Sequence, residues 1–295
     1  MNKLSFNPND LHRLNRLVFA IQRAALTEST GGHRTRHRGQ GVEFLDFRPY
    51  VPGDDLRKLD WNLLARTRQP FIRLHEEPRQ LAVTLLLDAS RSMFFGSPTT
   101  KFQQSQLIAA ALGSVALRGG DRLFVCSFSD SLSRPVGPLV GMRSLPRLLR
   151  ALDEIPDSGR LSNLQQAATD LRKLRRHRGL VVILSDFLNV SGREHAIESL
   201  VGGRARILVI QVLDAIDRGA GLVGMLRLRD SESGRMVDVK VTPSVLARYQ
   251  EAFTAGQDAL ESHVHQLGQF YAATTTAQPY LELVCQVLRT KAILK

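Results

Sequence analysis

Three oxygen-bearing side chains at alternate positions follow a strongly apolar segment. Residues 81–87 read Leu-Ala-Val-Thr-Leu-Leu-Leu, and Asp88, Ser90 and Ser92 come directly after them. Carboxylate and hydroxyl oxygens are the donors that Mg²⁺ and Mn²⁺ prefer, and no His or Cys cluster nearby favours a softer metal. The alternative is a strand-end turn whose oxygens cap a helix. The spacing therefore indicates either a metal site or a cap at the end of a strand.

Two further loops carry matching oxygens. Ser185 and Asp186 end the apolar run 179–187, and Ser162 precedes a helical pattern at residues 163–176. Ligands of an open parallel sheet bind at the carboxyl ends of its strands, so these loops are expected to meet. Mg²⁺ takes six oxygens and readily keeps waters, which leaves a position for a carboxylate from a partner. The predicted ligands are Asp88, Ser90, Ser92, Ser162 and Asp186.

The elements that position these residues alternate between strand and helix. The apolar segments are continuous rather than alternating, which is typical of parallel strands covered on both faces. The sequence thus predicts a doubly wound α/β sheet with helices on both faces. A hairpin pattern at residues 224–241 interrupts the alternation. The expected strands are 81–87, 122–128, 179–187, 204–213 and 270–276, and the expected helices are 101–118, 144–155, 163–176, 193–201, 243–267 and a last one ending near residue 289.

The N-terminal part has a different character. Apolar residues at helical spacing predict a helix over residues 8–26, and a glycine-bounded basic loop, 31–41, follows with no apolar periodicity. Pro52 and Gly53 suit a type II turn, after which Asp54 or Asp55 is expected to cap a short helix. That helix carries Leu56, Leu59, Leu63 and Leu64, and residues 70–74 form a short strand or hairpin arm. We expect a helix-and-hairpin extension over residues 1–78 and the sheet domain over residues 79–295.

Composition narrows the classes of partner. The chain has 295 residues, 43% of them hydrophobic, which suffices for a sizeable core. Forty Lys and Arg against 28 Asp and Glu give a net charge of +12, which suits an acidic partner, nucleic acid or a solvated basic surface. Cys126 and Cys285 lie in apolar runs and predict no disulfide framework. No signal peptide and no apolar run of ~18 residues is found, so we expect a cytoplasmic protein with no membrane span.

The oxygen pattern resembles the metal-ion-dependent adhesion site of the von Willebrand factor A domain. That site uses Asp-x-Ser-x-Ser, a later threonine and a later aspartate. The segment Asp-Ala-Ser-Arg-Ser matches the first part, Asp186 matches the aspartate, and Ser162 stands where the family usually has threonine. The resemblance implies that the three serines touch Mg²⁺ or Mn²⁺ and that Asp88 and Asp186 hold it largely through waters.

The preceding segment resembles the signature of domain-of-unknown-function family 58 (DUF58), which stands just before a von Willebrand A-like domain. The residues that match it are Arg48, Tyr50, Asp54, Asp55, Arg57, Asp60 and Trp61. From the residues alone, Arg–Asp pairs and a half-buried Trp would hold this segment on the sheet, or the block would form a second interaction surface. The family resemblance implies a MoxR-type AAA+ ATPase as partner and a chaperone-like adaptor role.

Three functions remain open at this point. The first is a non-enzymatic binding module that engages an acidic protein surface through its metal. The second is a Mg²⁺-dependent phosphoester hydrolase, but no His or Lys is tied by motif to the oxygen loops, and no phosphate loop or nucleophile elbow is found. The third is nucleic-acid binding through Arg34, Arg36 and Arg38, although an aromatic content of 6% is thin for base stacking. We favour the first.

Overall fold

The computed structural model divides into two compact units. One comprises residues 1–26 and 81–295, and the other comprises residues 27–80. The expected boundary near residue 78 is close to this division, but the first residues group with the sheet domain because Leu14 is buried in its core. The described residues are 8–14, 17–19, 44–56, 59–75, 80–157, 161–174, 179–188, 192–203, 205–229, 234–290 and 293–294.

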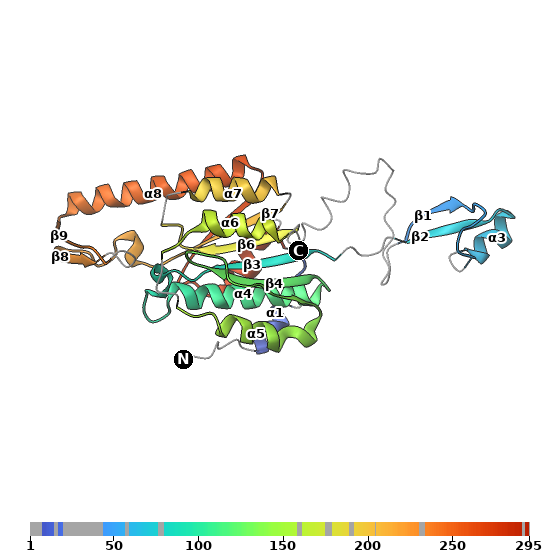
Figure 1. Ribbon diagram of the computed structural model, residues 1–295, viewed down its shortest axis with the longest axis horizontal. Coiled ribbons are helices and arrows are strands. Elements are labelled where there is room, and N and C mark those ends of the chain that lie inside the picture. Colours follow the sequence, from blue (N-terminus) through green and yellow to red (C-terminus); the bar gives the residue numbers. More distant parts are fainter. Residues whose placement is uncertain are drawn as a thin grey trace. The chain divides into compact units, whose positions relative to one another are not determined.

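A six-stranded sheet forms the centre of the larger unit, in the order β10-β7-β6-β3-β4-β5 (Figure 1). Its first five strands are parallel, and only the edge strand β5 runs antiparallel to its neighbour. Because β3 is central, its carboxyl end lies between those of β4 and β6. The strands are β3 (Ala82–Asp88), β4 (Arg122–Phe128), β5 (Val136–Leu139), β6 (Leu180–Ser185), β7 (Arg206–Leu213) and β10 (Phe270–Thr275).

Helices cover both faces of this sheet, and each face has its own apolar core. One core joins α1 (Pro8–Leu14), α4 (Lys101–Arg118), α5 (Leu145–Asp153) and the C-terminal helical turns to the sheet. The other joins α6 (Leu164–Lys173), α7 (Arg193–Gly202) and α8 (Pro243–Gln266). Apolar side chains on both faces of each strand explain the continuous apolar runs. The predicted doubly wound, mostly parallel sheet with helices on both faces is confirmed.

Two antiparallel hairpins lie outside this sheet. β8 (Gly224–Arg229) pairs with β9 (Met236–Val241), as the alternating pattern predicts. In the smaller unit, β1 (Phe44–Pro49) pairs with β2 (Phe71–His75), and α3 (Trp61–Thr67) lies between them in sequence. The strand-or-arm interpretation of residues 70–74 is therefore confirmed.

Three local expectations differ from the structure. α1 ends at Leu14, and Phe19 instead pairs as an isolated bridge with Leu294, so a helix through residues 17–19 is wrong. The Gly- and Pro-rich stretch between β4 and α5, which is absent from the expected strands, contains the strand β5. The cap of α3 is Asp60, whose carboxylate accepts from two backbone N–H groups, and neither Asp54 nor Asp55.

The chain's C-terminal helical segment is split into short pieces: α9 (Tyr280–Glu282), a π-helical turn (Leu283–Val287) and α10 (Leu288–Thr290). Short 3₁₀ turns include η2 (Arg91–Phe94) after β3, η3 (Met142–Ser144) before α5 and η4 (Ile216–Arg218) after β7. None of the helices in the described part of the chain is both long enough and apolar enough to cross a membrane. Cys126 and Cys285 are both free thiols.

Candidate metal-binding site

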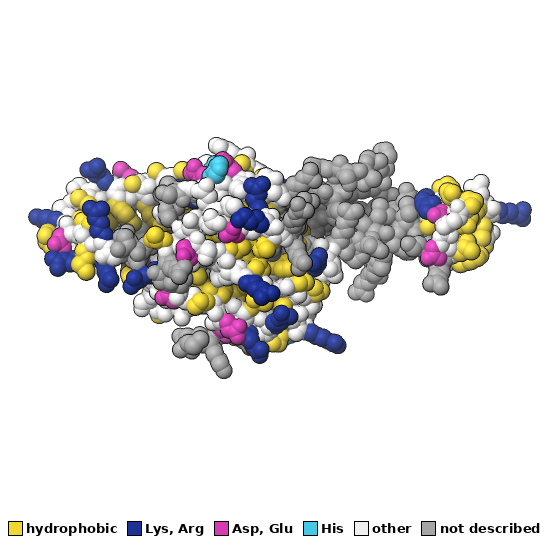
Figure 2. All heavy atoms as spheres, in the orientation of Figure 1, with side chains coloured by type: hydrophobic (Ala, Val, Ile, Leu, Met, Phe, Trp, Pro, Cys, Tyr) yellow, Lys and Arg dark blue, Asp and Glu magenta, His cyan; other side chains and the backbone are white. Residues whose placement is uncertain are grey.

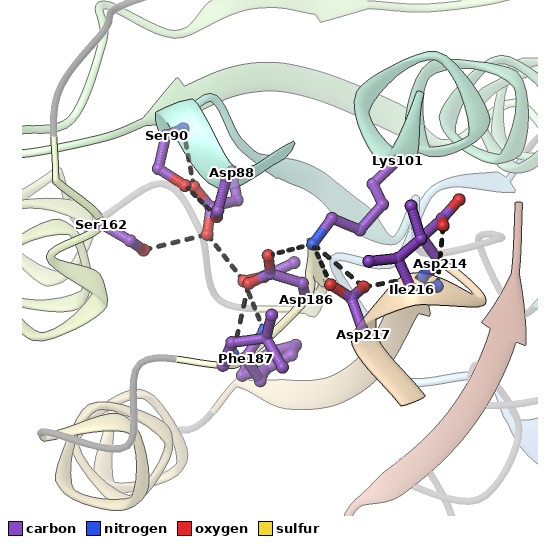
Figure 3. A network of polar contacts seen from close by, with 12 residues as sticks. Asp88, Ser90, Lys101, Ser162, Asp186, Phe187, Asp214, Ile216 and Asp217 are labelled. Carbon is purple, nitrogen blue, oxygen red and sulfur yellow. Dashed lines mark hydrogen bonds and ion pairs between the residues drawn. The ribbon is translucent and has the colours of Figure 1, made fainter. Parts of the chain in front are cut away.

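Asp88 ends β3 and lies fully buried at the carboxyl edge of the sheet. Its Oδ1 accepts a hydrogen bond from the backbone N–H of Ser90 at 2.9 Å. Its Oδ2 accepts from the hydroxyls of Ser185 at 2.6 Å and Ser162 at 2.9 Å (Figure 3). The β3–β6 register brings Ser185 here, since the two strands run parallel side by side. Three loops that are distant in sequence therefore meet at one carboxylate.

Ser90 and Ser92 complete the cluster of oxygens on the β3 side. Their hydroxyl oxygens lie 3.2 Å apart, and Ser90 is fully buried. Ser90 precedes η2, yet its side chain makes no capping hydrogen bond to that turn. The Ser90 hydroxyl therefore does not cap this turn. The Ser90 hydroxyl is hydrogen-bonded to Asp88, and the Ser92 hydroxyl contacts that of Ser90.

Asp186 follows β6 and is paired with a cation from this same chain. Its Oδ2 lies 2.7 Å from the ammonium of Lys101, the first residue of α4, and both side chains are buried. Its Oδ1 accepts from the backbone N–H of Leu188 at 3.2 Å. No sequence motif ties a lysine to these loops, but the fold brings Lys101 to Asp186, 85 residues away along the chain. The residue that links the loops electrostatically is Lys101.

The same ammonium reaches a second carboxylate. Lys101 Nζ lies 3.1 Å and 3.3 Å from the two oxygens of Asp217, which belongs to η4 (Figure 3). Asp217 Oδ2 also accepts from the backbone N–H of Asp214, at 2.8 Å. Asp214 in turn accepts from Ile216 N–H at 3.0 Å and from the Thr276 hydroxyl at 2.7 Å. The turn after β7 is thus joined to the site through Lys101.

Electrostatics at Asp88 are unfavourable for its charged form. Burial, and then the nearby charge of Asp186, raise the pKa of Asp88 to about 6, against an ordinary value of 3.8. Hydrogen bonds from Ser185 and Ser90 oppose that rise without cancelling it. For Lys101, burial lowers the pKa, but Asp186 and Asp217 outweigh it, so its pKa is raised and it stays charged. The formal net charge of the three carboxylates of Asp88, Asp186 and Asp217 together with the ammonium of Lys101 is −2. Counting the buried carboxylate of Asp214 as well makes it −3.

This donor set has the chemistry of a hard-cation site. Every side-chain donor except Lys101 is an oxygen, and the surplus negative charge matches a divalent ion. Within the described ranges, however, no three or more His, Cys, Asp or Glu side chains are grouped so that they could hold a metal. Hydroxyls would therefore have to supply much of the coordination. The residues that would hold Mg²⁺ or Mn²⁺ are Ser90, Ser92 and Ser162, with Asp88 and Asp186 behind them.

All five predicted ligands lie at this edge of the sheet. Residues that the prediction left out of the ligand set are Ser185, Lys101, Asp214 and Asp217. Ser185 was readable from the sequence, since it directly precedes Asp186 at a strand end. Lys101 was not, because a lysine in the first turn of a helix is normally solvated and its partner Asp217 is 116 residues away.

The family-signature residues lie in the smaller unit, which we describe by itself. Arg48 and Asp54 form a two-pronged ion pair with N–O distances of 2.7 and 2.5 Å, around the turn that Pro52 and Gly53 make. Gly53 has φ +107°, as the second central position of a type II turn requires. Tyr50 is half-buried and Asp55 is exposed, while Arg57 lies outside the described residues.

Within the smaller unit the Trp61 side chain is 64% exposed, and the expectation that it packs on the sheet stays a prediction. Trp61 begins α3 beside its cap Asp60, and Val51 and Leu56 are exposed as well. The basic loop 31–41, including Arg34, Arg36 and Arg38, lies outside the described residues, and the nucleic-acid hypothesis built on it stays a prediction.

Comparison with known proteins identifies the family. The model of the family described as "Protein of unknown function DUF58" matches residues 46–259, most of the chain. The chain belongs to the DUF58 family. It is 31% identical over 228 residues to the uncharacterized protein Rv1480 of Mycobacterium tuberculosis (strain H37Rv) and, to the same extent, to Mb1516 of Mycobacterium bovis, covering 76% of this chain and 72% of each relative. The resemblance in the signature block is thereby confirmed.

Solved structures similar to this DUF58 protein are distant in sequence. BatB from Bacteroides thetaiotaomicron is 13% identical with a TM-score of 0.45, and the match covers 72% of this chain and 98% of BatB. Proximal thread matrix protein 1 of the mussel byssus, solved with a zinc-occupied MIDAS motif, is 12% identical with a TM-score of 0.41, covering 72% of this chain and 47% of that one.

Proposed function

We propose that this DUF58 protein is a non-enzymatic docking module that binds Mg²⁺ or Mn²⁺ at the Asp88 site and, through that metal, a carboxylate of a partner protein. The observation that carries the proposal is the convergence of Asp88, Ser90, Ser92, Ser162 and Asp186 at one edge of the sheet. A metal held by hydroxyls and waters keeps exchangeable positions, and a partner carboxylate is a suitable ligand for one of them.

The neighbouring hairpin supports a protein rather than a small molecule as the partner. β8 follows the turn after β7, so the hairpin rises from the same edge of the sheet as the site. The side chains of Val223, Met225 and Met236 are 75%, 72% and 59% exposed. Basic and apolar side chains gather at this end of the larger unit (Figure 2). Exposed apolar residues of this kind mark surfaces that other proteins cover.

The family resemblance suggests which partner to try first. A MoxR-type AAA+ ATPase is the candidate, with the docking module acting as its adaptor in a chaperone-like role. The excess of 12 positive charges on the chain suits an acidic surface on that partner and speeds the encounter between them.

The test is calorimetric titration of the whole protein with MgCl₂ and with MnCl₂, alone and with an acidic peptide that carries a single Asp or Glu. We expect the wild type to bind metal, the peptide to bind only with metal present, and both to be lost in Ser90→Ala/Ser92→Ala. Asp170→Ala is the matched control, since Asp170 is a partly exposed carboxylate that pairs with Lys173 and Gln166 on α6. Peptide binding that persists in EDTA would refute the metal-bridged mode.

A further inference from the structure

Lys101 occupies a position that two physical effects oppose. It is the first residue of α4, where the helix dipole disfavours a cation, and only 1% of its surface is exposed. A buried ammonium is strongly destabilising unless carboxylates compensate its charge. Asp186 and Asp217 supply that compensation, at 2.7 Å and 3.1 Å. The helix start itself is already satisfied by Thr100 and Gln103, so Lys101 is not needed to cap it.

The ammonium stands between the candidate metal site and the turn after β7. On one side it contacts Asp186, a predicted metal residue. On the other it contacts Asp217, whose backbone carbonyl accepts from the Tyr249 hydroxyl of α8 at 2.6 Å. Asp217 also receives the N–H of Asp214. Lys101 is thus the link between the site and the segment that leads into the β8–β9 hairpin and α8 (Figure 3).

We propose that Lys101 is a resident cation that competes with the divalent metal for Asp186, and that metal binding shifts the ammonium toward Asp217 and tightens the turn at residues 214–219. This inference rests on the proposed metal site and assigns its regulation. Two cations that share one carboxylate repel each other, so Lys101 weakens metal binding. By linkage, any partner that tightens metal binding also changes the turn beside the hairpin.

The competition is tested by titrating the protein with Mn²⁺ and measuring free Mn²⁺ by electron paramagnetic resonance. Lys101→Met keeps the length of the side chain and removes its charge. We expect it to bind Mn²⁺ at least tenfold more tightly than the wild type. Lys173→Met, which removes an exposed lysine paired with Asp170, should leave the affinity within twofold. Unchanged or weaker binding by folded Lys101→Met overturns the competition.

A second pair of variants covers the case in which Lys101→Met fails to fold. Lys101→Met/Asp217→Asn removes one positive and one negative charge, so the network keeps its formal charge while Asp186 loses its competing cation. It should bind Mn²⁺ at least tenfold more tightly than the wild type, and more tightly still than Asp217→Asn alone. Equal binding by the double variant and the wild type overturns the inference. If none of these proteins binds Mn²⁺, the metal site is absent and the proposed function fails with it.

The transmission is measured separately by amide hydrogen exchange. In the wild type, Mn²⁺ should slow amide exchange in a peptide spanning residues 214–219. The ammonium of Lys101 then pairs with Asp217 alone, and this stronger pair tightens the turn. The effect should vanish in Lys101→Met/Asp217→Asn, which binds the metal but lacks both partners. Metal binding by the wild type with no change in that peptide would refute the transmission while leaving the metal site intact.

Discussion

Asp88 makes the stability of the metal-free protein depend on pH in an unusual direction. Its carboxyl group is fully buried beside Asp186, and its pKa is raised from 3.8 to about 6. A group whose pKa is raised by folding stabilises the folded state when protonated, and that stabilisation is lost as the pH rises through 6. The difference between 6 and 3.8 corresponds to about 3 kcal/mol of unfolding free energy, of which roughly 2 kcal/mol falls between pH 4.5 and 7.5.

The perturbation that isolates this contribution is Asp88→Asn, which keeps the shape and removes the charge. Urea unfolding in EDTA is measured from pH 4.5 to 7.5 for both proteins. We expect the unfolding free energy of the wild type, relative to that of Asp88→Asn, to fall by about 2 kcal/mol over that range. Asp170→Asn, which removes a partly exposed carboxylate on α6, controls for unrelated changes of charge. Parallel curves for the wild type and Asp88→Asn would refute the reasoning.

Three further outcomes follow from other contacts. Gly179→Ala places a Cβ only 2.1 Å from the backbone oxygen of Ala82, where two sheet strands leave no room, and should cost about 3 kcal/mol or more in urea unfolding. Thr276→Val removes the hydroxyl that donates to buried Asp214 and should cost about 1–3 kcal/mol by the same assay. Excess EDTA should leave the far-ultraviolet circular dichroism unchanged, because the two apolar cores hold the helices on the sheet without a cation and Lys101 already pairs with Asp186.

The sheet was predictable because its strands are buried on both faces. Continuous apolar runs such as 122–128 identify a parallel strand with few competing interpretations, and β4 has those same bounds. β5 was not predictable, since Val-Gly-Pro-Leu has neither the length nor the composition of a strand and is held only by pairing with β4. The end of α1 was missed for a similar reason. The apolar periodicity of the sequence continues past Leu14, but Phe19 forms an isolated β-bridge with Leu294, which is distant in sequence.

The site residues that could be predicted from the sequence are those that stand at the ends of strands. Asp88 and Asp186 terminate neighbouring parallel strands, so their sequence positions alone bring them to one edge. Residues that reach the site from elsewhere carry no such signal. Asp217 belongs to a turn whose path after β7 no local pattern specifies, and Lys101 reads as an ordinary first-turn residue of α4. Their pairing is a tertiary contact, and only the folded chain brings the two together.

The hydroxyls around Asp88 can serve the site in both of its states. Without a cation, Ser162 and Ser185 donate their protons to Asp88 and so hold its buried charge. A hydroxyl also has two lone pairs, and it can turn them toward a cation while its proton stays on the carboxylate. The fold therefore does not need to rearrange its strands to accept a metal. What has to change is the partner of Asp186, which makes Lys101 the residue on which the competition between the two cations depends.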